Sequence, residues 1–263
     1  LLVTSLSRLL GLSFKRIQFT PDLMPADITG VEVFSRNGEF TYVKGPIFAN
    51  VILADEINRA PPKTQSALLE AMQERQVSIG NTTYPLPSPF FVLATQNPIE
   101  YEGTYPLPEA QLDRFMFMLK VNYPSINQEI EIVRRTTTGE LPSLTPVLTG
   151  EEILQIQKTI RNFDIPDDII KEVVTLVQKT RPETHLAPPI VKEYVEWGAG
   201  PRASQFILLA IKSLSLLRQS FLNFSSLIKE VAVPVLQHRL ILNYKAEIDK
   251  ITPETIINEV LKT

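Results

Sequence analysis

Short apolar runs separated by polar segments dominate the first half of the chain. Four runs read as strands, and they cover residues 16–20, 51–54, 90–95 and 115–121. Continuous apolar runs of this length are typical of parallel strands that are buried on both faces. A helical pattern with Pro61 and Pro62 in its first turn follows the second run. Because strands that alternate with helices form parallel sheets, the pattern predicts an α/β domain.

Two further segments alternate in polarity and predict inserted hairpins. Residues 31–43 contain Asn37-Gly38, the strongest short-range signal for a hairpin turn. Residues 76–86 alternate around Gly80-Asn81. A parallel sheet needs neither hairpin, so we expect both to be insertions into the α/β domain.

The second half of the chain predicts a separate helical domain. Residues 136–149 are rich in Thr, Pro and Ser and read as a linker, and Thr149 with Glu152 forms a capping box. Helical patterns follow at roughly residues 151–161, 166–180, 189–197, 202–218, 226–237 and 253–262. We therefore expect an α/β domain at residues 1–135, a linker at 136–149 and an all-helical domain at 150–263.

Composition and charge narrow the class of protein. The 263 residues carry a net charge of −3 and are 44% hydrophobic, which supports a substantial core and makes a nucleic-acid partner unlikely on charge alone. The absence of cysteine excludes disulfides, zinc-thiolate sites and thiol catalysis, and it fits a reducing compartment. The longest apolar segment, residues 206–217, is interrupted by Lys212 and is too short to span a bilayer. We expect a cytoplasmic protein without a membrane span.

The first ten residues have the pattern of a helix, and the sequence begins inside that helix. Leu2, Leu6 and Leu9 share one helical face, and Gly11 can end the helix. The segment has neither a basic flank nor a cleavage site, so we expect no signal peptide.

Two adjacent carboxylates, Asp55 and Glu56, end the apolar run in VILADEINRA at residues 51–60. Ligands of open parallel sheets bind outside the carboxyl ends of the strands. Asp55 could hold Mg²⁺ through its water shell, and Glu56 could orient or deprotonate an attacking water, as in the Walker B arrangement of nucleotide hydrolysis. The alternative that these residues leave open is a strand ending in a solvated turn, with Asp55 capping the next helix.

Three polar residues elsewhere are further site candidates, each with a structural alternative. Asn97 follows the third apolar run and could contact a γ-phosphate or its attacking water, although Asn97-Pro98 also reads as a turn. Arg114 lies where a short helix meets the next predicted strand and could simply pair with Asp113. Arg202 opens a helix of the second domain, where the helix dipole disfavours a cation, which indicates a partner such as a phosphate.

Long motif blocks in the chain closely resemble the MoxR family of AAA+ ATPases. The blocks are VILADEINRAPPKTQSALLEAMQERQV, FFVLATQNPIEYEGTYPLPEAQLDRF and GPRAS, with further likeness in FKRIQFTPDLMPADITG and VLQHRLILNY. The resemblance implies an AAA+ P-loop NTPase domain with a parallel sheet and inserted hairpins, followed by an all-α lid. It also implies ATP hydrolysis in a homo-oligomeric ring, usually a hexamer, coupled to remodelling of other proteins, often with partners that carry a von Willebrand factor A domain.

The same resemblance assigns roles to individual residues. It implies that Asp55 and Glu56 are the Walker B pair, with Asp55 serving Mg²⁺ and nucleotide and Glu56 catalytic. It implies that Asn97 is the sensor on the neighbouring strand, that Arg114 is the arginine finger and that Arg202 is the lid sensor that binds nucleotide. Residues 31–43 match the family's helix-2 insert.

The chain departs from the family pattern in two places. The Gly-rich phosphate loop, GxxGxxK[ST], should precede the first helix, and we expect it upstream of Leu1. The segment around Leu222 is shorter than in the family, so the chain's continuity there is in doubt.

Two alternative functions stay open: a nucleotide-gated scaffold with little turnover and a DNA-acting motor. The acidic balance of the chain disfavours the DNA-acting motor.

Overall fold

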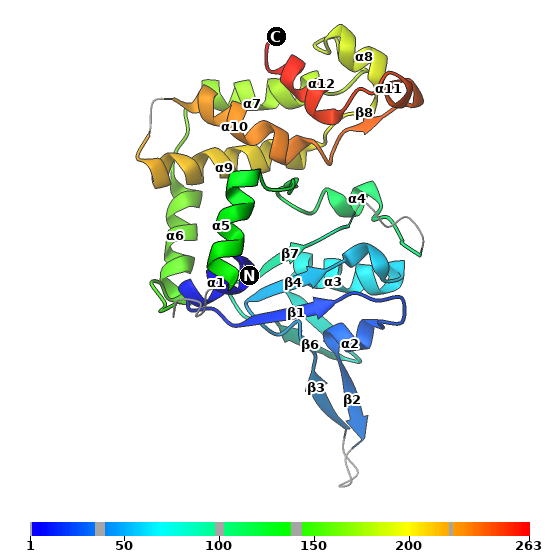
Figure 1. The fold of residues 1–263 in the computed structure, drawn as a ribbon, viewed down its shortest axis with the longest axis vertical. Helices are drawn as coiled ribbons and strands as arrows, with labels where there is room; N and C mark the ends of the chain where they lie inside the picture. The colour runs from blue at the N-terminus through cyan, green and yellow to red at the C-terminus, as the bar shows by residue number, and fades with distance from the viewer. Residues whose placement is uncertain (1, 35–39, 98–102, 138–143, 221–222) are drawn as a thin grey trace.

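A parallel sheet lies at the centre of the first domain in the computed structural model, which describes residues 2–34, 40–97, 103–137, 144–220 and 223–263 (Figure 1). Within the described residues its order is β1-β4-β7, with β1 at Phe14–Gln18, β4 at Val51–Asp55 and β7 at Phe91–Ala94. Both strand pairs are parallel. The central strand, β4, has its apolar residues buried or half-buried on both faces, as its continuous apolar run predicts. The predicted α/β class is confirmed.

Helices and one short turn complete the α/β domain. They are α1 (Leu2–Leu9), α2 (Pro25–Thr29), a 3₁₀ turn (Ile57–Arg59), α3 (Pro62–Glu74) and α4 (Glu109–Leu112). The prolines at the start of α3 lie where a helix has no intrahelical use for an N–H. Leu68, Leu69 and Ala71 bury the apolar face of α3 in a core that also contains Ile52 and Ala54 of β4. This packing fixes the loop between β4 and α3, which carries the candidate site.

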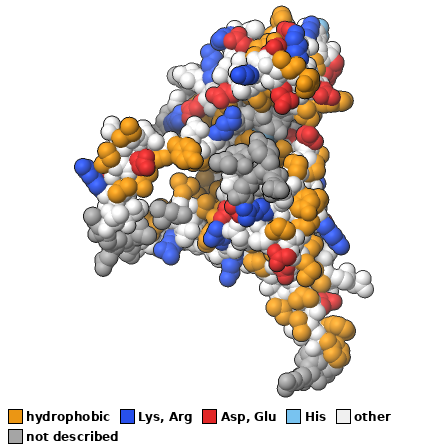
Figure 2. Space-filling model, turned by 45° about the vertical axis from the view of Figure 1, so that its right-hand side comes forward, with side chains coloured by type: hydrophobic (Ala, Val, Ile, Leu, Met, Phe, Trp, Pro, Cys, Tyr) orange, Lys and Arg blue, Asp and Glu red, His pale blue; other side chains and the backbone are white. Residues whose placement is uncertain are grey.

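Both predicted hairpins are present. They consist of β2 (Gly30–Phe34) with β3 (Phe40–Lys44), and β5 (Gln76–Ile79) with β6 (Thr82–Pro85). The predicted turn at Asn37-Gly38 lies outside the described residues, whereas Gly80 has the positive φ of 55° that its turn requires. The β2–β3 hairpin projects from the domain (Figure 1), and apolar side chains on it, including Phe34 and Phe40, are exposed (Figure 2).

The fourth predicted strand, at residues 115–121, is wrong. This segment forms no strand in the described structure because its backbone groups are bonded to the second domain. Met118 donates its N–H to the carbonyl of Pro234 at 2.9 Å, and the Met118 carbonyl accepts from the Gln237 side chain at 2.6 Å. Beyond that point Leu119 and Val121 have exposed side chains. An apolar run forms a strand only where a neighbouring strand accepts its hydrogen bonds, and the sequence pattern alone does not supply that neighbour.

Eight helices form most of the second half of the chain within the described residues. They are α5 (Ile126–Thr137), α6 (Gly150–Asn162), α7 (Asp167–Lys179), α8 (Pro189–Tyr194), α9 (Pro201–Arg218), α10 (Phe224–Leu236), α11 (Tyr244–Ile248) and α12 (Pro253–Val260). A separate hydrophobic core joins the helices from α7 onwards, with Ile207, Ile211 and Leu236 among its fully buried residues.

The expectation of an all-helical second domain needs one correction. Residues 195–197, predicted as the end of a helix, form β8 (Val195–Trp197), which pairs antiparallel with β9 (Ile241–Leu242). Val195 is β-branched and buried, and its strand partner comes from a segment more than forty residues later in the chain, so the pairing depends on tertiary contact.

The predicted domain boundary at residue 135 falls inside α5, which continues to Thr137. The capping box at Thr149 is formed: its hydroxyl accepts from the Glu152 N–H, and the Glu152 carboxylate accepts from the Thr149 N–H at 2.7 Å. Gly11 has a φ of 62°, and a Cβ there would lie 2.7 Å from the Leu148 carbonyl, so a side chain at this position would collide with the segment leading into α6. The segment around Leu222 that departs from the family pattern lies outside the described residues.

No helix within the described residues is both long and apolar enough to cross a membrane.

Candidate active site

The two predicted carboxylates lie together where β4 ends. Asp55 is the last residue of β4, and Glu56 follows it with φ 55° and ψ 49°, the left-handed conformation. Few residues other than glycine adopt this conformation, which costs roughly 1–3 kcal/mol and is concentrated at functional sites. Because of this left-handed backbone, the Glu56 side chain does not continue the alternating side-chain directions of β4. The side chains of Asp55 and Glu56 are 21% and 27% exposed, so a ligand can reach them.

Asp55 has one hydrogen-bond partner on β1 and another directly after β7. The hydroxyl of Thr95 donates to Oδ1 at 2.5 Å, and the guanidinium of Arg16 donates to Oδ2 from Nε at 2.9 Å and from a terminal nitrogen at 2.5 Å. The Thr95 hydrogen bond, and then Arg16, lower the pKa of Asp55 below its ordinary value. Asp55 is therefore a charged carboxylate at neutral pH.

Glu56 is held by three side chains. Gln18 donates its amide N–H to Glu56 Oε2 at 2.8 Å, and Arg59 lies 3.4 Å from the same oxygen. The Glu56 backbone N–H donates to the hydroxyl of Thr95 at 2.9 Å. Thr95 therefore bridges the two acidic residues, accepting from one and donating to the other. Gln18 and Arg59 both lie at Oε2 and orient the Glu56 side chain.

The chemistry of these groups fits a magnesium–nucleotide ligand. Mg²⁺ is bound in proteins by one or two carboxylates together with waters and phosphate oxygens. Asp55 is ionised, is reachable from solvent, and already holds a cationic group, the guanidinium of Arg16. Asp55 is the residue that would hold the metal, and Glu56 stands beside it, with Gln18 and Arg59 both at its Oε2.

Asn97 follows β7 on the same edge of the sheet. It lies two residues beyond Thr95, which contacts both carboxylates, and it is half-buried. The carboxyl ends of the parallel strands thus bring Asp55, Glu56 and the segment that carries Asn97 to one place, as predicted.

Arg202 lies elsewhere, in a cluster between the two halves of the chain. It opens α9 as predicted, and it donates to Asp113 Oδ2 at 2.8 Å. Arg239 binds the other oxygen of the same carboxylate at 2.8 Å, and its side chain is only 1% exposed. Its Nη2 donates to the carbonyls of Asp113 and Phe115 at 2.9 and 2.6 Å, and its Nη1 donates to the carbonyl of Val235. Asp113 is therefore the point at which two arginines of the second domain attach to the first.

His238 lies within this cluster. It is 8% exposed, and its Nε2 lies 3.0 Å from the Phe115 carbonyl and 2.6 Å from Arg239. Burial, followed by the charge of Arg239, lowers the pKa of His238 to about 4. The imidazole is neutral at pH 7 and adds no further positive charge beside the two arginines.

Arg114 does not form the ion pair with Asp113 that was its structural alternative. It donates to the Leu69 carbonyl on α3 at 3.1 Å, while the described ion pairs of Asp113 go to Arg202 and Arg239. Its guanidinium lines a small hollow of about 190 Å³ with residues of α3 and α4: Ser66, Glu70, Gln73, Glu74 and Gln111. None of the residues that contact Asp55 or Glu56 in the described structure lines this hollow.

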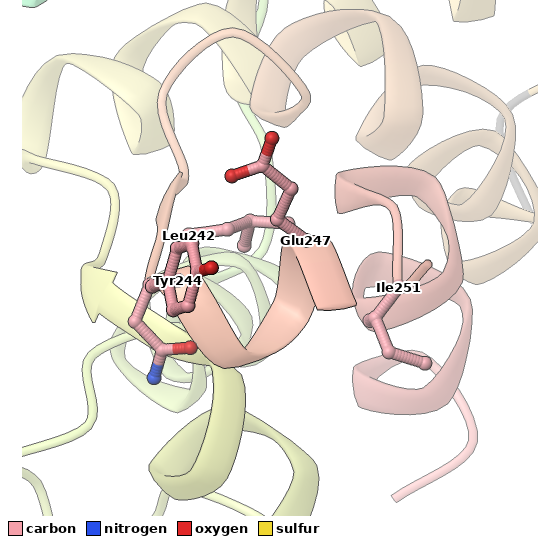
Figure 3. A pocket seen from close by; sticks show the side chains of 5 residues that line it. Leu242, Tyr244, Glu247 and Ile251 are labelled. Atoms are coloured by element: carbon pink, nitrogen blue, oxygen red, sulfur yellow. The ribbon is translucent and has the colours of Figure 1, made fainter. Parts of the chain in front are cut away.

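A hollow of about 480 Å³ lies in the second domain, away from all of these residues. Its lining comes from α11 and the segments on either side of it, with Leu242, Tyr244, Glu247 and Ile251 around the opening (Figure 3). None of the predicted site residues contributes to it.

Known families and relatives match this architecture. Residues 1–117 match the model of the ATPase family associated with various cellular activities (AAA), and residues 188–260 match the AAA lid domain. The chain is 48% identical to Chaperone MoxR1 of Mycobacterium tuberculosis, over 100% of this chain and 70% of that protein. The chain belongs to the MoxR family of AAA+ ATPases.

A further relative and a solved structure agree with this assignment. The chain is 43% identical to the protein YeaC of Bacillus subtilis, over 99% of this chain and 79% of YeaC. The crystal structure of a protein from Cytophaga hutchinsonii that bears the name of an ATPase superimposes with a TM-score of 0.91 at 42% identity, over 99% of this chain and 79% of that one. The AAA+ fold with a lid at its C-terminal end is therefore shared with a solved structure.

Four contacts of the MoxR chain were not anticipated from the sequence: those of Arg16, Gln18, Thr95 and Arg239. Arg16 and Gln18 are alternate residues of β1, so two polar residues that share one face of this predicted strand were the available signal. Thr95 was read as the end of an apolar run. Arg239 carries no local signal, because its partner, Asp113, is 126 residues away.

Proposed function

We propose that this MoxR-family chain hydrolyses ATP in a Mg²⁺-dependent reaction at Asp55 and Glu56. The observation that carries the proposal is the pair of adjacent carboxylates at the end of β4, one ionised and paired with a cation, the other turned out by a left-handed backbone. When bound, Mg²⁺ neutralises charge on the phosphate oxygens. Asp55 would hold the metal shell, and Glu56 would orient the attacking water and accept its proton.

Three other residues complete the proposed chemistry. Asn97 would place its amide against the γ-phosphate or the water, because it follows the strand beside β4. Arg202 would bind phosphate from the lid side. Arg114 would reach the nucleotide of a neighbouring subunit, and its position at a surface hollow away from Asp55 supports a role between subunits.

A phosphate-binding loop is also part of the proposal, upstream of α1. In the described sheet β7 is an edge strand. The apolar side chains of Phe117, Leu119, Val121 and Tyr123 alternate along the chain and are all exposed. Both features support a further parallel strand at the β7 side of the sheet. This strand would precede a GxxGxxK[ST] loop that leads into α1. A full-length sequence without such a loop would contradict ATP hydrolysis by this chain.

The biological role that fits is remodelling or maturation of partner proteins by a ring of identical subunits. Membership of the MoxR family supports a hexamer, and partners with a von Willebrand factor A domain, as parts of this proposal. The name Chaperone MoxR1 of the Mycobacterium tuberculosis relative supports activity on other proteins.

The test of the hydrolysis is Glu56→Gln in the full-length protein, compared with Glu183→Gln, an exposed glutamate of the second domain. Glu56→Gln keeps the side-chain shape and removes the proton acceptor, so we expect nucleotide affinity within a few-fold of wild type and turnover reduced by roughly 10²–10⁴. Glu183→Gln should change neither. Binding and turnover that fall together would show that Glu56 is structural and would refute its catalytic role.

A further inference from the structure

Arg114, the proposed arginine finger, lies on a short segment that joins the two hydrophobic cores. Within residues 113–116, Phe115 packs against the core of the first domain and Met116 packs against the core of the second. The Arg114 side chain donates to the Leu69 carbonyl at 3.1 Å and lines the small hollow beside α3 and α4. Because a long side chain extends from its own backbone, the direction of Arg114 depends on how residues 113–116 are held.

One guanidinium, that of Arg239, binds this backbone on both sides of Arg114. Its Nη2 donates to the Asp113 carbonyl at 2.9 Å and to the Phe115 carbonyl at 2.6 Å. Its Nε donates to the Asp113 carboxylate at 2.8 Å, and its Nη1 donates to the Met116 carbonyl at 3.4 Å. These acceptors belong to the residue before Arg114 and to the two residues after it. Arg239 therefore fixes the backbone that flanks Arg114.

Arg239 is itself held firmly by the second domain. Its side chain is 1% exposed, its guanidinium lies 5.0 Å from the centre of the Phe206 ring, and its Nη1 donates to the carbonyl of Val235 on α10. A guanidinium presents its donors in a planar fork of fixed shape, so one set of contacts orients the others. A lysine at this position would keep the charge but would lose the fork that binds two carbonyls at once.

We propose that Arg239 is a positioning residue for Arg114, and this inference rests on the role between subunits proposed above for Arg114. The buried guanidinium holds the residues on either side of Arg114 in the geometry that directs its side chain to the nucleotide of the neighbouring subunit. Arg239 therefore serves the neighbour's site and not the site at Asp55 and Glu56 of its own subunit. A displacement of about 1 Å in a group that acts on a transition state can cost about 10² in rate.

The first test measures ATP binding and turnover of full-length Arg239→Met at a temperature where its unfolding curve shows that it is folded. We expect ATP affinity within a few-fold of wild type and turnover reduced by about 10². Arg239→Lys is a second variant that keeps the charge beside Asp113, so we expect the same kinetic pattern with a smaller loss of stability. Leu176→Ala is the matched control: this buried residue of α7 belongs to the same core, so the variant should lose stability and keep its turnover.

Mixed rings show on which subunit's site Arg239 acts. Assembly of Arg239→Met with Glu56→Gln subunits should restore phosphate release, because an intact Glu56 then meets a correctly held Arg114 at about one interface in four of an equal random mixture. Assembly of Arg239→Met with Arg114→Ala subunits should restore none, because every finger in such a ring is missing or misplaced. Arg114→Ala assembled with Glu56→Gln is the reference pair and should recover activity.

The outcomes separate this inference from the proposed role of Arg114. Recovery of Arg239→Met with Arg114→Ala and not with Glu56→Gln would overturn the inference, because Arg239 would then serve its own subunit's site. Wild-type turnover of both folded Arg239 variants, or an equal loss of turnover in Leu176→Ala, would overturn it as well. In each of these cases recovery by the reference pair leaves the role of Arg114 standing. Failure of the reference pair to recover would refute the role of Arg114 between subunits, and this inference with it.

Discussion

Arg239→Met should destabilise the protein far more than Arg202→Met, although both arginines bind the same carboxylate. Arg239 is 1% exposed on its side chain and Arg202 is 40% exposed. Methionine is unbranched and long enough to replace much of the volume of arginine, so the substitutions remove chiefly the charge and the N–H donors. The two variants therefore measure how burial changes the contribution of each arginine to the free energy of unfolding.

The magnitude follows from what each substitution leaves unpaired. Removal of one partner of a buried ion pair costs about 3–5 kcal/mol. Asp113 keeps Arg202 when Arg239 is lost, but the carbonyls of Asp113 and Phe115 lose donors, so we expect about 3 kcal/mol for Arg239→Met. An exposed pair contributes about 0–1 kcal/mol, and this is the expectation for Arg202→Met.

Urea and thermal unfolding of the two variants would measure the difference. Trp197, the single tryptophan, reports the second domain by fluorescence, and circular dichroism reports the whole chain. At about 2–4 °C per kcal/mol for a chain of this size, Arg239→Met should lower Tm by about 6–12 °C and Arg202→Met by about 0–4 °C. Equal losses from the two variants, or a larger loss from Arg202→Met, would refute the reasoning from burial.

Two further predictions concern the subunit interface and the pH dependence of stability. Arg114→Ala should abolish hydrolysis, by roughly 10³–10⁵ in rate, while ATP still binds, and mixing with Glu56→Gln subunits should restore some phosphate release; near wild-type turnover of a verified oligomer would exclude Arg114 as the finger. His238 has a pKa of about 4 in the folded protein against an ordinary value of 6.5, so the unfolded chain binds the proton more readily. The contribution of the neutral imidazole to stability is therefore complete above pH 6.5 and is lost as the pH falls towards 4. His238→Gln should therefore reduce the loss of unfolding free energy between pH 7 and pH 4 by about 3 kcal/mol, and His185→Gln should not; denaturant titrations at both pH values that show the same loss in all three proteins would contradict the burial of His238 as its cause.

The sequence by itself determined the elements whose signals are local. The apolar run of β4, the prolines at the start of α3 and the capping box at Thr149 each depend on residues within one turn or one strand, and each is found where it was predicted. The same holds for the placement of Asp55 and Glu56, because a carboxylate pair directly after a buried parallel strand lies at the ligand-binding edge in any sheet of this type.

Only the tertiary structure decided features that need a distant partner. Residues 115–121 have the composition of a strand, but the backbone of Met118 is bonded to the end of α10, and β8 forms because Ile241 and Leu242 lie beside it. The pairing of Arg16 with Asp55 depends on the register between β1 and β4, which the pattern within either strand does not specify. Hydrogen bonds and ion pairs are satisfied by whichever groups folding brings within about 3 Å, and residues far apart in sequence carry no local record of that proximity.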